Sequence, residues 1–419
     1  MAKMLENILE LESVESLMQL VISPNTDFAA GVEALARGIN PENGQAVSPG
    51  ELFAMARSEG MELQLEKLMV KKAVETFYPL WQLNPQLLLF INLSELFMEY
   101  SMNDPYAFNL IRQYGIGRSN VVFDINQTSD GKMDLVSAFM EKYRSRGFFM
   151  CLDDVGLDYN NIDRVLYLNP DMIKVDVAAV RKMGNQHYQQ NFIKCLRFIS
   201  DLQGLLVVAK GLENEDDIRV SLENGAQFMQ GYYISEPAKL SEENINEVIG
   251  KYRSTMEAYF LNREDEVESN RMIIAKAIRM TKAIRSGIEG KTLLAIARIG
   301  EDIFAPCNFI ENIWFVNRNG RQIGNTLINE ERYSVRNAQL LQIYGEGSDF
   351  SGKELFRQLL DNNLEAWVTK PYRSVLTNNM CVGCSMYFKI GADKLVLCAN
   401  VNLEELEQYI INTQKPSSF

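Results

Sequence analysis

The chain has 419 residues, 47% of them apolar, and a formal net charge of −13 at pH 7. This length predicts two or three domains, or one barrel plus a smaller module, with enough apolar side chains for a sizeable core. The negative charge argues against a DNA-binding surface, because phosphate neutralisation needs clustered Lys and Arg. It leaves room for a small anionic ligand in one local basic pocket. The single histidine, in the polar stretch 184–187, argues against a histidine-based metal site or a Ser-His triad.

Membrane and export signals are not expected from the sequence. No run of 18 apolar residues occurs, so we expect no membrane-spanning helix. The first 20 residues have no basic cluster before an apolar run, which argues against a signal peptide. The six cysteines are scattered, which favours reduced thiols and a cytoplasmic location.

Short apolar runs recur through residues 1–240, each rich in β-branched or aromatic residues and bounded by polar ones. Such runs are typical of strands buried on both faces. Helical patterns such as 64–77 and 136–146 lie between them. Strand and helix alternate at roughly 30-residue spacing, which predicts an α/β fold, a TIM-like (β/α)8 barrel. The predicted strands include 19–22, 88–91, 121–123, 148–152, 172–173 and 205–208.

Polar residues gather where these predicted strands end. In a barrel the carboxyl ends of the strands form one face, so their side chains should converge on a pocket. We therefore expect a functional site there, built from Asn92, Asp124, Asn126, Asp153, Asp154, Lys174, Asp176 and Lys210.

Residues 241–290 show a helical pattern, with a charged run at 262–268 that we expect to interrupt it. Gly287 and Gly290 are candidate stop signals. The segment is predicted to be a helical connector, either a signalling helix or dimer seam, or one helix packed on the barrel. Beyond it, 312–316 with 321–324, and 386–390 with 395–401, predict two hairpins of a separate small α+β domain over 291–419.

Five motifs occur in the order and at the spacing of the EAL domain, the cyclic-di-GMP phosphodiesterase family of bacteria. Over more than half of its length the chain is therefore identified as similar to this family. The motifs are Gly31-Val32-Glu33-Ala34-Leu35-Ala36-Arg37, Ile91-Asn92-Leu93-Ser94, Cys151-Leu152-Asp153-Asp154-Val155-Gly156, the segment Asn169-Pro170-Asp171-Met172-Ile173-Lys174-Val175-Asp176, and Gln230-Gly231-Tyr232-Tyr233-Ile234-Ser235-Glu236-Pro237.

The resemblance implies a TIM-like barrel that hydrolyses cyclic-di-GMP with Mg²⁺ or Mn²⁺. Two divalent cations can hold and acidify the attacking water, and both ions prefer carboxylate and amide oxygens. The resemblance assigns metal contacts to Glu33, Asn92, Asp124, Asp153 and Asp154. It assigns catalytic positions to Lys174, Lys210 and Glu213, and ligand contacts to Gln19, Leu35, Arg37, Asp171 and Gln230.

Three departures from the family pattern bear on activity. The family's Glu-x-Thr-Glu motif is Asp124-Ile125-Asn126-Gln127 here, which shortens one metal ligand. The loop after the Asp pair, which couples catalysis to dimerisation in the family, is changed at 157–161. Lys210 stands where the family has the first Glu of Glu-Gly-Val-Glu.

Lys210 places a positive charge where a metal or its water should be held. An ammonium beside Asp153 and Asp154 stays protonated and could stand in for the second metal, but it cannot acidify a water. Alternatively the register slips and Glu213 or Glu215 supplies the missing carboxylate.

The C-terminal segment resembles a PAS- or Cache-like sensor in the runs 370–374 and 400–403. Asn400 and Asn402 stand where ligand-binding members often carry an Asp, which argues against an amine ligand.

Three functions remain open from sequence. The first is a catalytically degenerate cyclic-di-GMP receptor or regulator, with its metal lost or reduced to one ion. The second is a weakly active phosphodiesterase. The third is a protein-interaction module that no longer binds the nucleotide. In all three cases we expect the protein to be a cytoplasmic homodimer, and a protein partner is a further expectation.

Overall fold

The computed structural model of the chain describes residues 2–24, 28–126, 132–155, 161–178, 186–292, 295–296, 299–335, 345–390 and 393–414. The chain divides into two compact units, Met1–Phe260 and Leu261–Phe419. The division falls inside the predicted connector 241–290, so its first part belongs to the barrel unit and the rest to the smaller unit. Gln127 and residues 157–160 of the altered loop lie outside the described residues.

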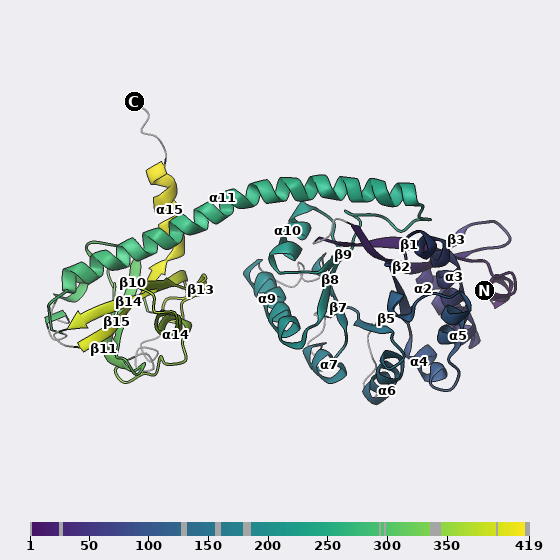
Figure 1. Ribbon diagram of the computed structural model, residues 1–419, viewed down its shortest axis with the longest axis horizontal. Helices are drawn as coiled ribbons and strands as arrows, with labels where there is room; N and C mark the ends of the chain where they lie inside the picture. The colour runs from purple at the N-terminus through teal and green to yellow at the C-terminus, as the bar shows by residue number, and fades with distance from the viewer. Residues whose placement is uncertain are drawn as a thin grey trace, which may run out of the picture. The chain divides into compact units, whose positions relative to one another are not determined.

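The first unit is a closed eight-stranded barrel with helices around it, as predicted (Figure 1). The hydrogen-bonded ring runs β1-β9-β8-β7-β6-β5-β4-β2 and closes through β1–β2, and the short β3 adds to β2. The strands are β1 Val14–Ser23, β2 Phe28–Ile39, β3 Ala46–Val47, β4 Leu88–Leu93, β5 Val121–Ile125, β6 Phe149–Leu152, β7 Met172–Asp176, β8 Leu206–Lys210 and β9 Phe228–Met229.

One strand departs from a uniform (β/α)8 barrel. β1 is antiparallel to both of its neighbours, β2 and β9, whereas the pairs from β2 through β4 to β9 are parallel. The connection from Ser23 to Phe28 is too short for a crossover, since a parallel connection needs a dozen residues or more. The second strand must therefore fold back beside the first.

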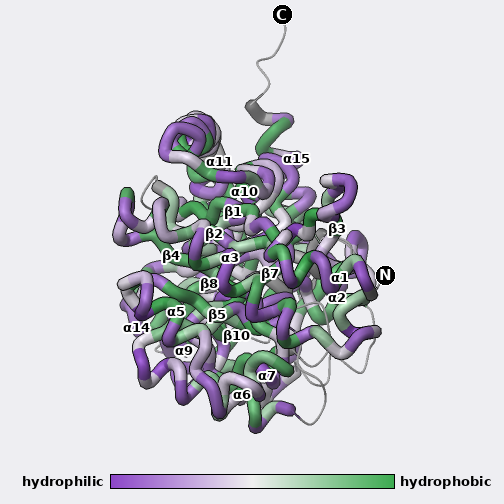
Figure 2. Tube along the Cα trace, turned by 90° about the vertical axis from the view of Figure 1, so that its right-hand side faces the viewer, coloured by the Kyte–Doolittle hydropathy of each residue, from purple (hydrophilic) through white to green (hydrophobic). Residues whose placement is uncertain are grey.

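The barrel helices cover the outside of the strands. The outer core includes Leu89, Ile91 and Phe123 from the strands, with Phe77 and Tyr143 from the helices. Figure 2 colours the chain by hydropathy, and green, hydrophobic stretches alternate with purple, hydrophilic ones along it. The helices are α1 Ala2–Glu10, α2 Pro49–Glu59, α3 Glu62–Leu83, α4 Glu95–Ser101, α5 Tyr106–Gln113, α6 Met133–Arg144, α7 Asn161–Leu168, α9 Gln186–Gln203 and α10 Glu215–Glu223.

The connector is one continuous helix, α11, from Glu242 to Ile288, 47 residues long. The predicted interruption at 262–268 is wrong. Glu and Arg are good helix formers, so a charged run does not by itself end a helix. Tyr252 and Met256 pack in the barrel unit, and Met280 and Ile284 pack in the second unit.

The second unit is built on an antiparallel sheet in the order β11-β10-β15-β14-β12, with β13 paired to β14. Both predicted hairpins are present. One face of the sheet packs on the C-terminal part of α11, and the other face packs on α14. The elements are β10 Ile310–Val316, β11 Gln322–Ile328, α14 Glu354–Asp361, β12 Ala366–Val368, β13 Tyr372–Arg373, β14 Met380–Ile390, β15 Asp393–Asn402 and α15 Leu403–Gln414.

No helix among the described residues combines the length and apolarity needed to cross a membrane.

Candidate functional site

A layer of polar side chains lies just above an apolar layer inside the barrel. Side chains alternate along a strand, so a residue two positions further on points to the same side. Apolar side chains from six strands fill the lower layer. In each case the residue two positions nearer the carboxyl face of the barrel is polar and lies in the upper layer. The apolar residues are Val21, Phe90, Val122, Cys151, Met172 and Val208, and the corresponding polar residues are Gln19, Asn92, Asp124, Asp153, Lys174 and Lys210.

For the antiparallel β1 the polar residue, Gln19, precedes Val21 in sequence, because this strand runs the other way. Gln19 still reaches the same layer, where its Oε1 accepts a hydrogen bond of 3.0 Å from Gln230 Nε2. The barrel geometry thus brings residues more than 200 positions apart to one floor.

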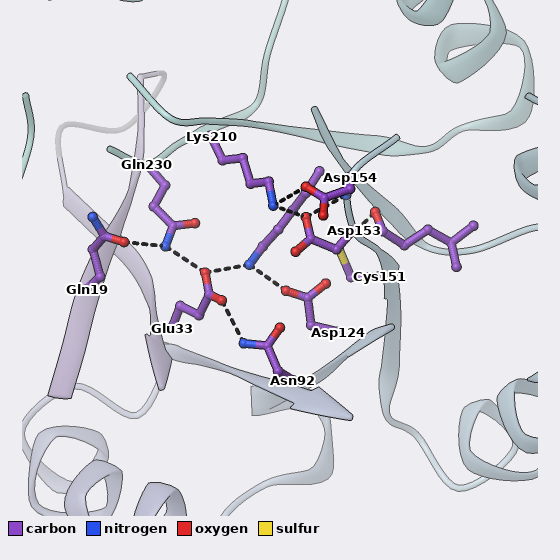
Figure 3. A network of polar contacts seen from close by, with 11 residues as sticks. Gln19, Glu33, Asn92, Asp124, Cys151, Asp153, Asp154, Lys210 and Gln230 are labelled. Atoms are coloured by element: carbon purple, nitrogen blue, oxygen red, sulfur yellow. Dashed lines mark hydrogen bonds and ion pairs between the residues drawn. The ribbon is translucent and has the colours of Figure 1, made fainter. Parts of the chain in front are cut away.

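Glu33 is the centre of this layer (Figure 3). Its carboxylate accepts hydrogen bonds of 2.7 Å from Asn92 Nδ2, Gln230 Nε2 and Lys174 Nζ. Lys174 is fully buried and also lies 2.5 Å from Asp124 Oδ2. The Lys174 ammonium therefore bridges two carboxylates, one on β2 and one on β5.

Burial and charge act against each other on these groups. Burial alone would raise the pKa of Glu33, but Lys174, Asn92 and Gln230 together lower that pKa to about 2. Burial and the nearby Asp153 and Glu33 carboxylates raise the pKa of Asp124 to about 7, against the attraction of Lys174. Burial would lower the pKa of Lys174, but the surrounding carboxylates raise it well above its usual value. Lys174 is therefore charged.

Lys210 makes the second ion cluster. Its Nζ lies 2.5 Å from Asp153 Oδ1 and 2.6 Å from Asp154 Oδ1. Burial would lower the pKa of Lys210, but these two carboxylates raise it above its ordinary value. Asp154 has a left-handed backbone, with φ of 54°, which is uncommon for a residue other than glycine. That turn directs its carboxylate to the same ammonium as the neighbouring Asp153.

Two hollows meet at Glu33. The larger, of about 600 Å³, runs past Leu35, Asn92 and Asp153 to Phe53. The smaller, of about 250 Å³, is lined by Lys210 and Gln230, among others. A ligand that spans both would pass over the Glu33 cluster, with Lys210 facing it from one side.

The EAL domain family matches residues 2–237, more than half of the chain. The chain belongs to the EAL domain family. The uncharacterised EAL-domain protein YkuI of Bacillus subtilis is 21% identical over 56% of this chain and 58% of its own length. The probable cyclic di-GMP phosphodiesterase PdeI of Escherichia coli is 26% identical over 57% of this chain and 31% of its own length. These matches span less than two thirds of either relative.

Solved structures show the same fold. The crystal structure of Bacillus subtilis YkuI in complex with c-di-GMP and calcium superposes with a TM-score of 0.78 at 17% identity, covering 96% of this chain and 98% of that one. The EAL domain of FimX from Pseudomonas aeruginosa, bound to c-di-GMP, gives a TM-score of 0.52 at 22% identity, over 57% of this chain and 96% of that one.

The structure brings most of the predicted EAL site residues together, but not all of them. Asp171 precedes β7, and its carboxylate accepts a hydrogen bond of 2.8 Å from Met150 N and lies 3.5 Å from Arg144 Nε. It therefore lies at the opposite end of the strand from the site. Arg37 donates to the backbone oxygen of Ala36 at 2.8 Å and lines neither hollow. Glu213 is exposed but lines the smaller hollow.

Asp176, which was expected at the site from its place at the end of a strand, lines the smaller hollow. Sequence reasoning left two other residues near this site without a role. Tyr232 lines the smaller hollow and belongs to a motif that was recognised. Glu66 of α3 lines the larger hollow and accepts bonds from Ser94 N at 2.6 Å and Ser94 Oγ at 2.5 Å. Burial raises the pKa of Glu66 to about 7 against these two bonds. The Glu66 carboxylate thus holds the backbone just after Asn92. This contact joins residues far apart in the sequence, so local sequence patterns do not predict it.

A close backbone approach explains Gly231. A Cβ at this position would lie 2.3 Å from Leu212 N and O, which no side chain can accommodate. The turn after Gln230 is therefore held against the turn after Lys210, and this brings the two side chains to one hollow.

Four oxygen donors of this layer are of the types that bind a divalent metal. Glu33, Asn92, Asp124 and Asp153 supply oxygens from four neighbouring strands, which is the chemistry that Mg²⁺ or Mn²⁺ needs. The position between Asp153 and Asp154 holds the Lys210 ammonium instead. Within the described part of the chain, no cluster of three or more His, Cys, Asp or Glu side chains is arranged to hold a metal. The donor types therefore suit a divalent ion, but as they stand the ammonium groups of Lys174 and Lys210 bridge the carboxylates.

Proposed function

We propose that this EAL-family protein is a cyclic-di-GMP receptor or regulator that binds the dinucleotide without efficient hydrolysis. One observation carries the proposal: the Lys210 ammonium contacts both Asp153 and Asp154, at 2.5 and 2.6 Å. A site for two metals needs a carboxylate at this position, and here the position supplies a cation.

Ligand binding is supported by the shape and charge of the site. The two hollows meet at Glu33 and suit an elongated ligand. Lys210 keeps about a fifth of its side chain exposed, at 20%, so its ammonium can meet a phosphate. Solved relatives of the same fold, YkuI and the FimX EAL domain, hold c-di-GMP. We assign ligand contacts to Gln19, Leu35 and Gln230, and a phosphate contact to Arg37 after its side chain leaves the Ala36 carbonyl.

Loss of hydrolysis follows from the ammonium. Two divalent ions would supply an acidified water and neutralise the charge on the leaving oxygen. The residues around Asp153 and Asp154 cannot bind the second ion while Lys210 lies between them. An ammonium has no coordination site for a water, so it keeps the charge balance of the pocket but not its chemistry.

A weak metal-dependent phosphodiesterase is the second candidate. It is favoured by the oxygen donors Glu33, Asn92, Asp124 and Asp153, which come from four adjacent strands of the barrel or the residue directly after one of them. A single Mg²⁺ or Mn²⁺ there could support slow turnover. The Asp124 side chain is one methylene shorter than the family's Glu, which limits how far its carboxylate reaches toward a metal ion.

We further propose that the second unit is a PAS- or Cache-like sensor joined to the barrel through α11. Its antiparallel sheet packs one face on that helix, through Ile313 and Phe315 on the sheet and Met280 and Ile284 on the helix. We also propose a cytoplasmic homodimer that acts on a protein partner.

The test measures binding and turnover on the full chain. Calorimetry with cyclic-di-GMP, in EDTA and then in Mg²⁺ or Mn²⁺, should show binding that does not require the metal. Chromatography of the nucleotide after long incubation should show no linear product. Robust conversion to the linear dinucleotide would overturn the proposal that the protein does not hydrolyse it efficiently. No binding in any buffer would leave only the protein-interaction function.

A matched pair of variants locates the ligand. Lys210→Gln removes the cation that faces the hollow, so the dissociation constant should rise by roughly tenfold or more, as for a charge-assisted contact. Lys239→Gln removes an exposed lysine paired with Glu15 outside the site and should leave the dissociation constant unchanged. Equal effects of the two changes would place the ligand elsewhere.

A further inference from the structure

The second unit contains a cavity of about 420 Å³ that is unrelated to the barrel site. This volume lies within the range of small-molecule sites in proteins. It lies on the α14 side of the sheet, where Trp314, Phe350 and Leu355 form part of both the cavity lining and the hydrophobic cluster. Trp314 and Phe350 are in contact, with ring centroids 5.6 Å apart.

An unpaired carboxamide lies in this lining. Asn312 is fully buried, with no exposed surface, and among the described residues neither its Nδ2 nor its Oδ1 has a hydrogen-bond partner. Trp314 lies two residues further along β10 and thus on the same side of the sheet. Its Nε1 is also buried and has no hydrogen-bond partner among the described residues. A buried polar group without a partner is costly, and native proteins contain few of them. Three such atoms beside one cavity indicate a ligand that pairs with them.

The neighbouring carboxamide behaves differently. Asn400 lies opposite Asn312 in the sheet register, and its Oδ1 accepts a hydrogen bond of 2.5 Å from the Tyr372 hydroxyl. The two asparagines line the same cavity, but the oxygen of Asn400 is already engaged within the protein. Asn312 is thus the group that the fold leaves for a ligand.

The charges of the lining restrict the ligand. The charged residues that line the cavity, Lys353, Glu354 and Lys370, are exposed, and they include both signs. No charged side chain in the lining is buried to neutralise a charged ligand, and burying an unpaired charge is strongly unfavourable. The ligand is therefore neutral in the part that enters the cavity.

We propose that this cavity binds a neutral planar ring that carries a hydrogen-bond donor and an acceptor on one edge, as in a primary amide, a lactam or a nucleobase. A carboxamide presents one donor group and one acceptor side by side and pairs with such an edge through two hydrogen bonds. The Trp314 indole N–H supplies a further donor, and the aromatic walls suit a flat ring. The proposal does not depend on what the barrel binds.

The probes are nicotinamide, hypoxanthine and adenine, titrated into the full chain at concentrations up to the millimolar range. Binding is followed by calorimetry and by tryptophan fluorescence. N,N-dimethylnicotinamide is the matched control, because it keeps the ring and the carbonyl but lacks the N–H donor. At least one of the three probes should bind, and the dimethyl analogue should bind at least tenfold more weakly than nicotinamide if nicotinamide is that probe.

Asn312→Leu keeps the volume of the side chain and removes both polar atoms. Binding of the probe should fall by at least tenfold. Without any probe, the melting temperature of the second unit should rise by about 2–4 °C, because an unpaired buried group has been removed. Asn400→Leu, which breaks the bond to Tyr372, should lower that temperature.

Three results would overturn the proposal. They are no binding of any of the three probes, binding that Asn312→Leu leaves unchanged, and a fall in melting temperature for Asn312→Leu. The last result would mean that the carboxamide is paired in the folded protein and has a structural role.

Discussion

Replacing Lys210 and Asp124 together by glutamate should convert the protein into a metal-dependent phosphodiesterase. Lys210→Glu removes the ammonium that contacts Asp153 and Asp154 and restores a carboxylate. Asp124→Glu restores the reach of a metal ligand at the end of β5. With Mg²⁺ or Mn²⁺, we expect turnover of cyclic-di-GMP at least about a hundredfold above wild type, or about 2.7 kcal/mol in activation free energy.

The single variants show which of the two substitutions accounts for the loss of hydrolysis. Lys210→Met removes the charge without adding an oxygen ligand for the metal, and it should remain inactive. Asp124→Glu alone should also remain inactive, because Lys210 still lies in the second position. The two glutamate changes should be non-additive, since both act on one cluster. Turnover that appears in Lys210→Met as strongly as in the double variant would show that the charge alone blocked hydrolysis.

Lys174→Met should be among the most destabilising single substitutions in the barrel. Lys174 is fully buried and bridges Glu33 and Asp124, at 2.7 and 2.5 Å. Its removal leaves two buried carboxylates without their cation, a change that typically costs about 3–5 kcal/mol. Denaturant unfolding followed by circular dichroism should show this loss in the transition of the barrel unit.

Added Mn²⁺ should recover part of that stability in Lys174→Met but change the wild type little, because the uncovered carboxylates can then hold the ion. Lys239→Met is the control for losing a lysine, since Lys239 is 70% exposed and its pair with Glu15 lies at the surface. It should unfold almost like wild type. A Lys174→Met protein as stable as this control would contradict the bridging role.

The barrel and its polar layer were predictable because strand periodicity is local. Short apolar runs located the strands, and the polar residues that follow them, such as Asn92 and Asp153, had to meet at one end. The contact of Lys210 with Asp153 and Asp154 also follows from charge once the strands are in order.

Other features depend on three-dimensional register that sequence does not reveal. Asp171 and Lys174 are three residues apart, so along an extended chain they lie roughly 10 Å from each other. Only Lys174 reaches the site, whereas Asp171 binds Met150 N at the other end. The bridge from Lys174 to Glu33 and Asp124 joins three separate strands, and the Glu66 contact with Ser94 joins a helix to a distant turn.

A count of the metal ions at the site would show whether Lys210 replaces the second metal. Crystals of the wild-type protein, soaked with Mn²⁺ and cyclic-di-GMP, would be measured by anomalous scattering. We expect at most one ion, held by Glu33, Asn92, Asp124 and Asp153, with the Lys210 ammonium still in contact with Asp153 and Asp154. Two well-occupied ions in the unmodified protein would contradict the claim that Lys210 takes the place of the second metal.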